Sequence, residues 1–136
     1  MVPRYLRAMP AGLDVVREIV DALNRGDVES MLARMDSDFE WRPLEDSPVA
    51  RDYRGHDRVR GYVEDWLATF DDLRLELGEA SAVGDHVVVE VAGSARGRAS
   101  GVELYNRFCQ VWTLRDRKAV RMREYPNRDE ALAALR

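Results

Sequence analysis

The chain has 136 residues, of which 46% are hydrophobic and 34% charged, enough apolar material for the core of one domain. Its 21 basic and 25 acidic residues give a net charge of −4, which disfavours binding to nucleic acid. One cysteine and two histidines exclude an internal disulfide and disfavour a metal site, and no apolar run approaches the roughly 20 residues of a membrane helix. We therefore expect a cytoplasmic protein with no metal, no membrane contact and one domain at residues 13–136, after an N-terminal extension at residues 1–12.

Two consecutive helices are predicted at the start of the domain. The first covers residues 13–24, where apolar residues recur at the spacing of one helical face. Gly26 ends this helix, and Asp27 is placed to cap a second, shorter helix that carries Met31, Leu32 and Met35. Both apolar faces must be buried against the rest of the domain.

A short strand and a long loop follow. Phe39, Trp41 and Pro43 alternate with charged residues, which predicts a strand that Pro43 ends. The next dozen residues, up to Gly55, contain turn formers and charges and predict a loop. Loops of this length are often functional covers, so the 43–55 segment could close over a pocket.

A third helix and a run of strands complete the chain. The helix covers residues 57–70 and has the largest share of aromatic residues, with an apolar stripe at helical spacing. After it the period changes to two, and turn residues separate successive strands up to Tyr125. Asn127 to Glu130 resembles a capping box for a short C-terminal helix at residues 131–136. Helices followed by antiparallel strands predict an α+β fold.

Four segments in this order resemble those of a known superfamily. They are residues 15–27, Tyr53-Arg54-Gly55, residues 111–116 and residues 121–125. The sequence is similar to the nuclear transport factor 2-like superfamily, in particular its SnoaL-like polyketide cyclase, ketosteroid isomerase and limonene epoxide hydrolase branches. The resemblance implies a cone-shaped fold, in which a curved antiparallel sheet wraps around three helices and leaves an apolar pocket at its open end. It also implies no cofactor and a homodimer.

Strand alternation divides the last two long strands into faces. Asn106, Phe108 and Gln110 share the apolar face of one strand, together with Leu104, Trp112 and Leu114. Val120, Met122 and Glu124 share a face of the next strand, where Glu124 is the one acid. Loss of hydration in an apolar pocket would raise the pKa of Glu124 toward neutrality, the range useful for proton transfer. The alternative is a solvated carboxylate at the end of a strand, or a satisfied polar network.

Further residues are candidates for contact with a ligand. Asn106 and Gln110 could hold Glu124 or orient a substrate oxygen by hydrogen bonds. Aromatic and apolar residues suited to flat ligands are Trp41, Tyr62, Trp66, Phe108 and Met122, although ordinary core packing is the competing interpretation. His56 is expected at the start of the third helix, His86 is expected to be exposed, and Cys109 faces outward without a neighbouring base.

The catalytic patterns of the related branches are incomplete in this chain. Ile19 stands where the isomerase branch has a catalytic tyrosine, and Arg42-Pro43 where it has its aspartate. Glu124 matches an acid at the end of the last strand of the epoxide hydrolases, but the Arg-x-Asp pair of that branch would fall near Val91-Ala92-Gly93. The resemblance thus leaves a SnoaL-like pocket with one candidate acid.

Two functions remain open at this point. The first is a cofactor-free cyclase or isomerase for a small hydrophobic molecule, with Glu124 as its general acid and base. The alternative is a non-catalytic module for ligand binding or dimerisation. A homodimer is expected through the outer face of the sheet, which carries Tyr105, Arg107, Cys109, Val111, Thr113, Arg121 and Tyr125.

Overall fold

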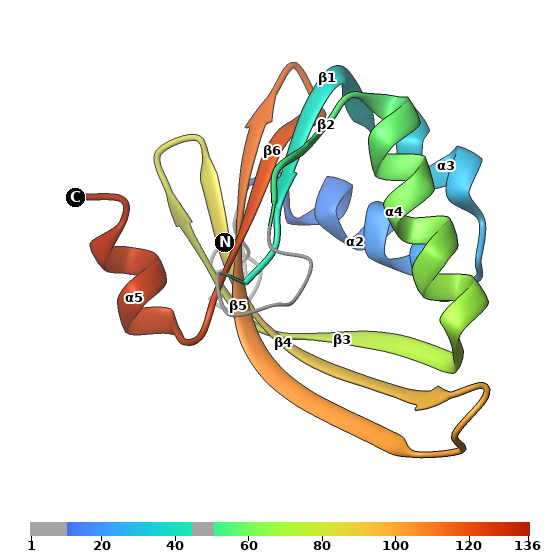
Figure 1. Ribbon diagram of the computed structural model, residues 1–136. Coiled ribbons are helices and arrows are strands. Elements are labelled where there is room, and N and C mark those ends of the chain that lie inside the picture. The colour runs from blue at the N-terminus through green and yellow to red at the C-terminus, as the bar shows by residue number, and fades with distance from the viewer. Residues whose placement is uncertain (1–10, 45–50) are drawn as a thin grey trace, which may run out of the picture.

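A computed structural model describes residues 11–44 and 51–136, and its elements follow the predicted order (Figure 1). The helices are α2 (Leu13–Asn24), α3 (Val28–Ala33), α4 (His56–Thr69) and α5 (Arg128–Ala133). The strands are β1 (Met35–Arg42), β2 (Tyr53–Arg54), β3 (Phe70–Val83), β4 (His86–Gly97), β5 (Glu103–Arg115) and β6 (Lys118–Tyr125). The prediction of an α+β fold is confirmed. Most of the extension predicted at residues 1–12 lies outside the described residues.

The described strands form one curled, unclosed sheet in the order β2-β1-β6-β5-β4-β3. Helices α2, α3 and α4 lie on its concave side, and α5 lies on the opposite side (Figure 1). The predicted cone is therefore present, with one correction to its strand directions. Strands β1 and β6 pair in parallel, whereas the other neighbouring pairs of the described sheet are antiparallel. No hairpin joins β1 to β6, so chain connectivity does not require them to run in opposite directions.

Strand pairing also moves three predicted boundaries. Met35 was predicted in the second helix but begins β1, where it pairs with Ala119 of β6. Phe70 was predicted in the third helix but begins β3 and pairs with Gly97 of β4. The predicted 43–55 loop contains β2, whose Tyr53 pairs with Trp41; residues 45–50 of that loop are not described. In each case a partner far along the chain provides the hydrogen bonds that decide the local conformation.

The register of β6 differs from simple alternation. An irregularity in its pairing with β5 falls between Thr113 and Leu114, and Ala119 rather than Val120 enters the core. An extra residue in one strand changes the face of the residues on one side of it. Met122 and Glu124 nevertheless keep the relative positions expected from alternation, two residues apart.

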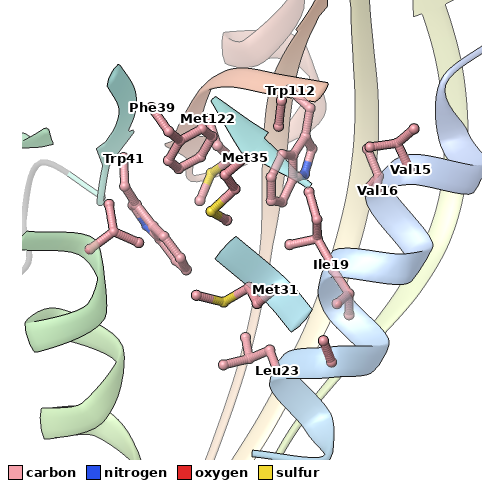
Figure 2. Packing of buried hydrophobic residues seen from close by; sticks show 14 of the residues in the cluster. Val15, Val16, Ile19, Leu23, Met31, Met35, Phe39, Trp41, Trp112 and Met122 are labelled. Carbon is pink, nitrogen blue, oxygen red and sulfur yellow. The ribbon is translucent and has the colours of Figure 1, made fainter. Parts of the chain in front are cut away.

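The main core lies between the concave face of the sheet and the helices. Val16 and Ile19 of α2 are 0% and 2% exposed, and Trp112 of β5 is 1% exposed. Figure 2 shows the thioether groups of Met31 and Met122 gathered between the helix α2 residues and Trp41. Flexible methionine side chains fill the irregular space between a helix and a curved sheet.

On the outer face, α5 covers part of the surface that was expected to form a dimer contact. Cys109 and Val111 are buried there together with Val88 and Ala131 of the same chain. Tyr105 stays exposed, at 64%. The homodimer stays a prediction, and the contact surface available for it is smaller than the sequence indicated. The helix begins at Arg128 rather than 131 because the Asn127 side chain accepts a hydrogen bond from the Glu130 backbone N–H, at 2.9 Å.

Asn24, the last residue of α2, attaches that helix to the sheet. Its Nδ2 donates to the backbone oxygen of Leu75 at 2.9 Å, and its Oδ1 accepts from the backbone N–H of Leu75 at 2.8 Å. The amide thus pairs with β3 as a neighbouring strand would. Two partly buried backbone groups of β3 depend on this one side chain.

We predict that Asn24→Ala lowers the free energy of unfolding by about 2 kcal/mol, because it leaves a donor and an acceptor of Leu75 without their partners. Urea denaturation at constant pH measures this loss. Asn24→Asp is the matched control, because its carboxylate keeps the acceptor and removes only the donor at neutral pH. At low pH the protonated carboxyl regains an O–H donor, so this variant should be destabilised less there than at neutral pH. Equal stability of Asn24→Ala and the native chain would contradict the attachment.

Candidate functional site

A cavity of about 530 Å³ opens at the end of the cone that the helices leave unfilled. Segments from α2, β1, α4, β3, β4, β5 and β6 surround it, and most of the lining side chains are apolar. The lining residues are Leu23, Trp41, Pro43, Leu44, Tyr62, Val63, Trp66, Leu73, Leu75, Gly93, Ser94, Ala95, Leu104, Tyr105, Asn106, Arg107, Phe108, Glu124 and Pro126. This volume is in the range of small-molecule sites.

Aromatic rings form one side of the cavity. Tyr62 of α4 lies edge-on to Trp41 of β1, with 5.5 Å between ring centroids, and stacks on Tyr53 of β2 at 4.2 Å. Trp66, one helical turn after Tyr62, meets it edge-on at 6.1 Å. Residues four apart share a helix face, so α4 presents both rings to the same space. These contacts pack the rings against one another and give the cavity an apolar aromatic side.

Glu124 is the one acidic residue among the described residues that line the cavity. It follows Met122 on the same face of β6 and pairs in register with Gln110 of β5. The Gln110 Nε2 donates to its Oε2 at 3.4 Å, and Gln110 in turn accepts a 2.9 Å hydrogen bond on Oε1 from the indole Nε1 of Trp112. The backbone N–H of Leu44 also donates to the Glu124 carboxyl. A carboxyl group held by two donors thus faces an apolar cavity.

Burial sets the protonation state of this carboxyl. Loss of hydration raises the pKa of Glu124 from 4.5 to about 7, and the hydrogen bonds from Gln110 and Leu44 act in the opposite direction because they stabilise the charge. Burial also raises the pKa of the Tyr62 phenol, and the charge of Glu124 adds to that rise. Near neutral pH the site therefore combines a carboxyl that can exchange a proton with a phenol that stays protonated.

The structure brings most of the predicted site residues together. Trp41, Tyr62, Trp66, Asn106 and Phe108 line the cavity with Glu124. Gln110 is 1% exposed and lies behind Glu124 rather than in the lining. Met122 is fully buried in the main core and does not line the cavity, because the side chains of α2 and α3 pack over its part of the strand.

The remaining candidates lie away from the cavity. His56 begins α4, and its Nε2 is 3.0 Å from the backbone oxygen of Met35. His86 was predicted to be exposed but is partly buried, with Nδ1 at 2.9 Å from the Thr113 hydroxyl. Burial raises the pKa of the Cys109 thiol to about 11, so this cysteine is a poor nucleophile. Among the residues that the structure describes, no group of three or more His, Cys, Asp or Glu could hold a metal ion.

Sequence patterns missed two donors in this site. The Leu44 N–H lies in a segment predicted as loop, where no periodicity places a backbone group. Trp112 was expected on the inner face, but its bond to Gln110 was not; the signal was the two-residue spacing, which puts both side chains on one face of β5. No helix in the described part of the chain has the length and hydrophobicity needed to cross a membrane.

Comparisons with known proteins agree with this architecture. Residues 16–122 match the family model described as SnoaL-like domain. Solved structures with the same fold include an NTF2-like protein of unknown function from Burkholderia pseudomallei, 22% identical, with a TM-score of 0.76 over 92% of this chain and 97% of that chain. TerC, co-crystallised with polyporic acid, is 24% identical with a TM-score of 0.75, over 91% of this chain and 96% of its own.

A third structure, from Jannaschia, is assigned as a SnoaL-like polyketide cyclase. It is 16% identical with a TM-score of 0.73, over 91% of this chain and 88% of that chain. No significant match was found among curated protein sequences. Identities this low show a shared fold and leave the reaction to be argued from the cavity itself.

The raised pKa of Glu124 predicts a specific dependence of stability on pH. Between about pH 4.5 and 7 the folded chain retains a proton that the unfolded chain has released. This contribution to stability is full below pH 4.5 and is lost as the pH rises through 7, by roughly 3 kcal/mol in all. Glu124→Gln removes the ionisation, so the variant should gain stability relative to the native chain as the pH rises from 4.5 to 8. Urea denaturation at several pH values measures this difference, and a constant difference would contradict the buried carboxyl.

Proposed function

We propose, from the premise that the chain belongs to the SnoaL-like domain family, that it is a cofactor-free enzyme acting on a small hydrophobic carbonyl compound. Glu124 serves as its general acid and base, in a cyclase or isomerase reaction. One observation carries the proposal: a carboxyl group with a pKa of about 7 faces an apolar cavity of about 530 Å³. A group with a pKa near the working pH is suited both to accept and to return a proton.

The cavity is suited to a flat, largely apolar ligand. Its aromatic side, formed by Trp41, Tyr62 and Trp66, offers ring faces and edges. Among proteins of the same fold, TerC was co-crystallised with polyporic acid, and the Jannaschia protein is assigned as a polyketide cyclase. Both descriptions agree with a ligand of this class, and polyporic acid is a practical first probe.

The reaction needs no group beyond those in the cavity and the substrate. The Glu124 carboxylate removes a proton from a carbon next to a carbonyl; the C–H electron pair moves into an enolate, and an O–H bond forms on Glu124. The carboxyl then returns the proton to another carbon in an isomerisation, or to the oxygen formed when the enolate carbon attacks a second carbonyl in a cyclisation. Asn106, which lines the same cavity, has an amide N–H suited to the enolate oxygen.

A thermal-shift screen of the native chain and Glu124→Gln tests this function. The panel holds polyporic acid and polyketide-, terpene- and steroid-like compounds. A ligand present at about 100 times its dissociation constant should raise the melting temperature of both proteins by roughly 9 °C. Binders are then incubated with each protein and analysed by mass spectrometry and NMR.

Product formation by the native chain alone, with binding retained in Glu124→Gln, is the expected result. The control variant Glu90→Gln removes an exposed acid of β4 and should leave turnover unchanged. Binding without turnover by either protein would contradict the enzyme and favour the alternative, a ligand-binding module. Equal turnover by both proteins would remove Glu124 from the chemistry.

A further inference from the structure

We propose that Trp112 is a positioning residue of this site: its indole N–H fixes which end of the Gln110 amide faces Glu124. Trp112 does not line the cavity, so it acts only through Gln110. The inference rests on the proposed role of Glu124. It adds the residue that, through Gln110, favours the ionised form of the Glu124 carboxyl.

The geometry allows only one orientation of the amide. An indole N–H can donate but cannot accept, so the atom 2.9 Å from Trp112 Nε1 must be the oxygen of Gln110. The NH2 group of Gln110 then faces the Oε2 of Glu124, at 3.4 Å. Gln110 and Trp112 are each 1% exposed, which prevents bulk water from replacing either bond.

The strand register explains why these three groups meet. Gln110 and Trp112 are two residues apart on β5 and therefore share a face of the sheet. Gln110 pairs with Glu124 of β6, and Trp112 pairs with Met122. The indole, the amide and the carboxyl thus form a continuous row, with its closed end in the core and its open end at the cavity.

The orientation of the amide has a direct chemical consequence. The two ends of a glutamine amide have nearly the same shape, so apolar packing alone does not select one of them. With the NH2 group toward Glu124, the amide stabilises the carboxylate. With the oxygen toward it, the amide would repel the carboxylate and favour the protonated acid. Trp112 therefore favours a carboxylate that accepts a proton from a C–H bond as the first step, after which the same O–H bond breaks to return it.

Other titratable or charged groups around Glu124 cannot replace this effect. Tyr62 of α4 carries a phenol that stays protonated, and the ring of Tyr53 of β2 stacks on the Tyr62 ring. Arg107 of β5 lines the cavity as its one cationic residue among those described, and its Nε donates to the Tyr105 hydroxyl at 2.8 Å. The Leu44 N–H is a backbone donor whose direction is independent of Trp112.

The sign of the pKa change distinguishes positioning from ordinary packing. Trp112→Phe keeps an aromatic ring but removes the N–H, so the amide can turn its oxygen toward Glu124. The pKa of Glu124 should then rise by about 1. A variant that merely loosened the packing would admit water, which favours the charged form and lowers this pKa.

The experiment is an NMR titration of the carboxyl carbon of Glu124 in protein labelled with ¹³C-glutamate. Glu124→Gln identifies the signal by its absence. Trp41→Phe is the matched control because it makes the same change to an indole whose Nε1 has no hydrogen-bond partner among the described residues. We expect a higher pKa in Trp112→Phe and no rise in Trp41→Phe. An unchanged or lower pKa in Trp112→Phe, or an equal rise in the control, would overturn the proposal.

Two further measurements extend the test, and the second of them uses the native chain and needs no variant of Trp112. In a Gln110→Leu background, Trp112→Phe should no longer change the pKa of Glu124, because the amide through which it acts is absent; a persisting rise would overturn the proposal. In the native chain, a strong nuclear Overhauser effect between the Trp112 indole proton and the Gln110 amide protons would show the opposite orientation and would also overturn it. None of these measurements requires turnover. The role of Trp112 can therefore be overturned while the proposed function stands, and the proposed function can be overturned while the role of Trp112 stands.

Discussion

Partial burial of the Glu124 side chain, which removes water from its carboxyl, is the constraint on which the open end of this domain depends. A carboxyl group taken out of water must either accept hydrogen bonds or hold its proton, and this site allows both. The Gln110 amide and the Leu44 N–H favour the charge, while the apolar surroundings oppose it, and the balance lies near neutral pH. The bond from Leu44 depends on the position of that backbone N–H, and the bond from Gln110 depends on the pairing of β5 with β6. The chemistry of the site is therefore tied to the register of the sheet.

The cavity itself results from a mismatch between the helices and the curled sheet. Helix α2 covers the closed end of the concave face, and its last residue, Asn24, pairs with Leu75 of β3. Because Leu75 also lines the cavity, this attachment holds one side of the site at a fixed distance from the core. Helix α4 provides the opposite side with Tyr62 and Trp66, which contact each other rather than fill the space between them and β5. An unfilled apolar volume remains where the helices end.

Local patterns predicted the elements well and their long-range pairing poorly. Helix α2 has its predicted bounds because its apolar period and the stop at Gly26 lie within one segment of sequence. Met35 was misplaced because its pairing with Ala119, more than eighty residues away, decided its conformation. For the site, alternation placed Glu124 and Gln110 on the inner faces of neighbouring strands, and the register that pairs them came from the structure. It could not supply the Leu44 N–H, whose position depends on where a loop passes the end of β6.

The boundary between core and cavity crosses the sheet along two adjacent rows. Trp41, Met122 and Trp112 pair across β1, β6 and β5 and close the core, with exposed fractions of 7%, 0% and 1%. Two residues further along these strands, Glu124 of β6 and Gln110 of β5 form a polar row at the start of the cavity. Glu124 and Gln110 lie outside the packed row, whereas Trp112 belongs to the packed row and also donates a hydrogen bond to Gln110. Trp112, which closes the core, is thus also the residue that we propose orients the Gln110 amide, so that proposal makes the packing of the core and the protonation of Glu124 depend on one side chain.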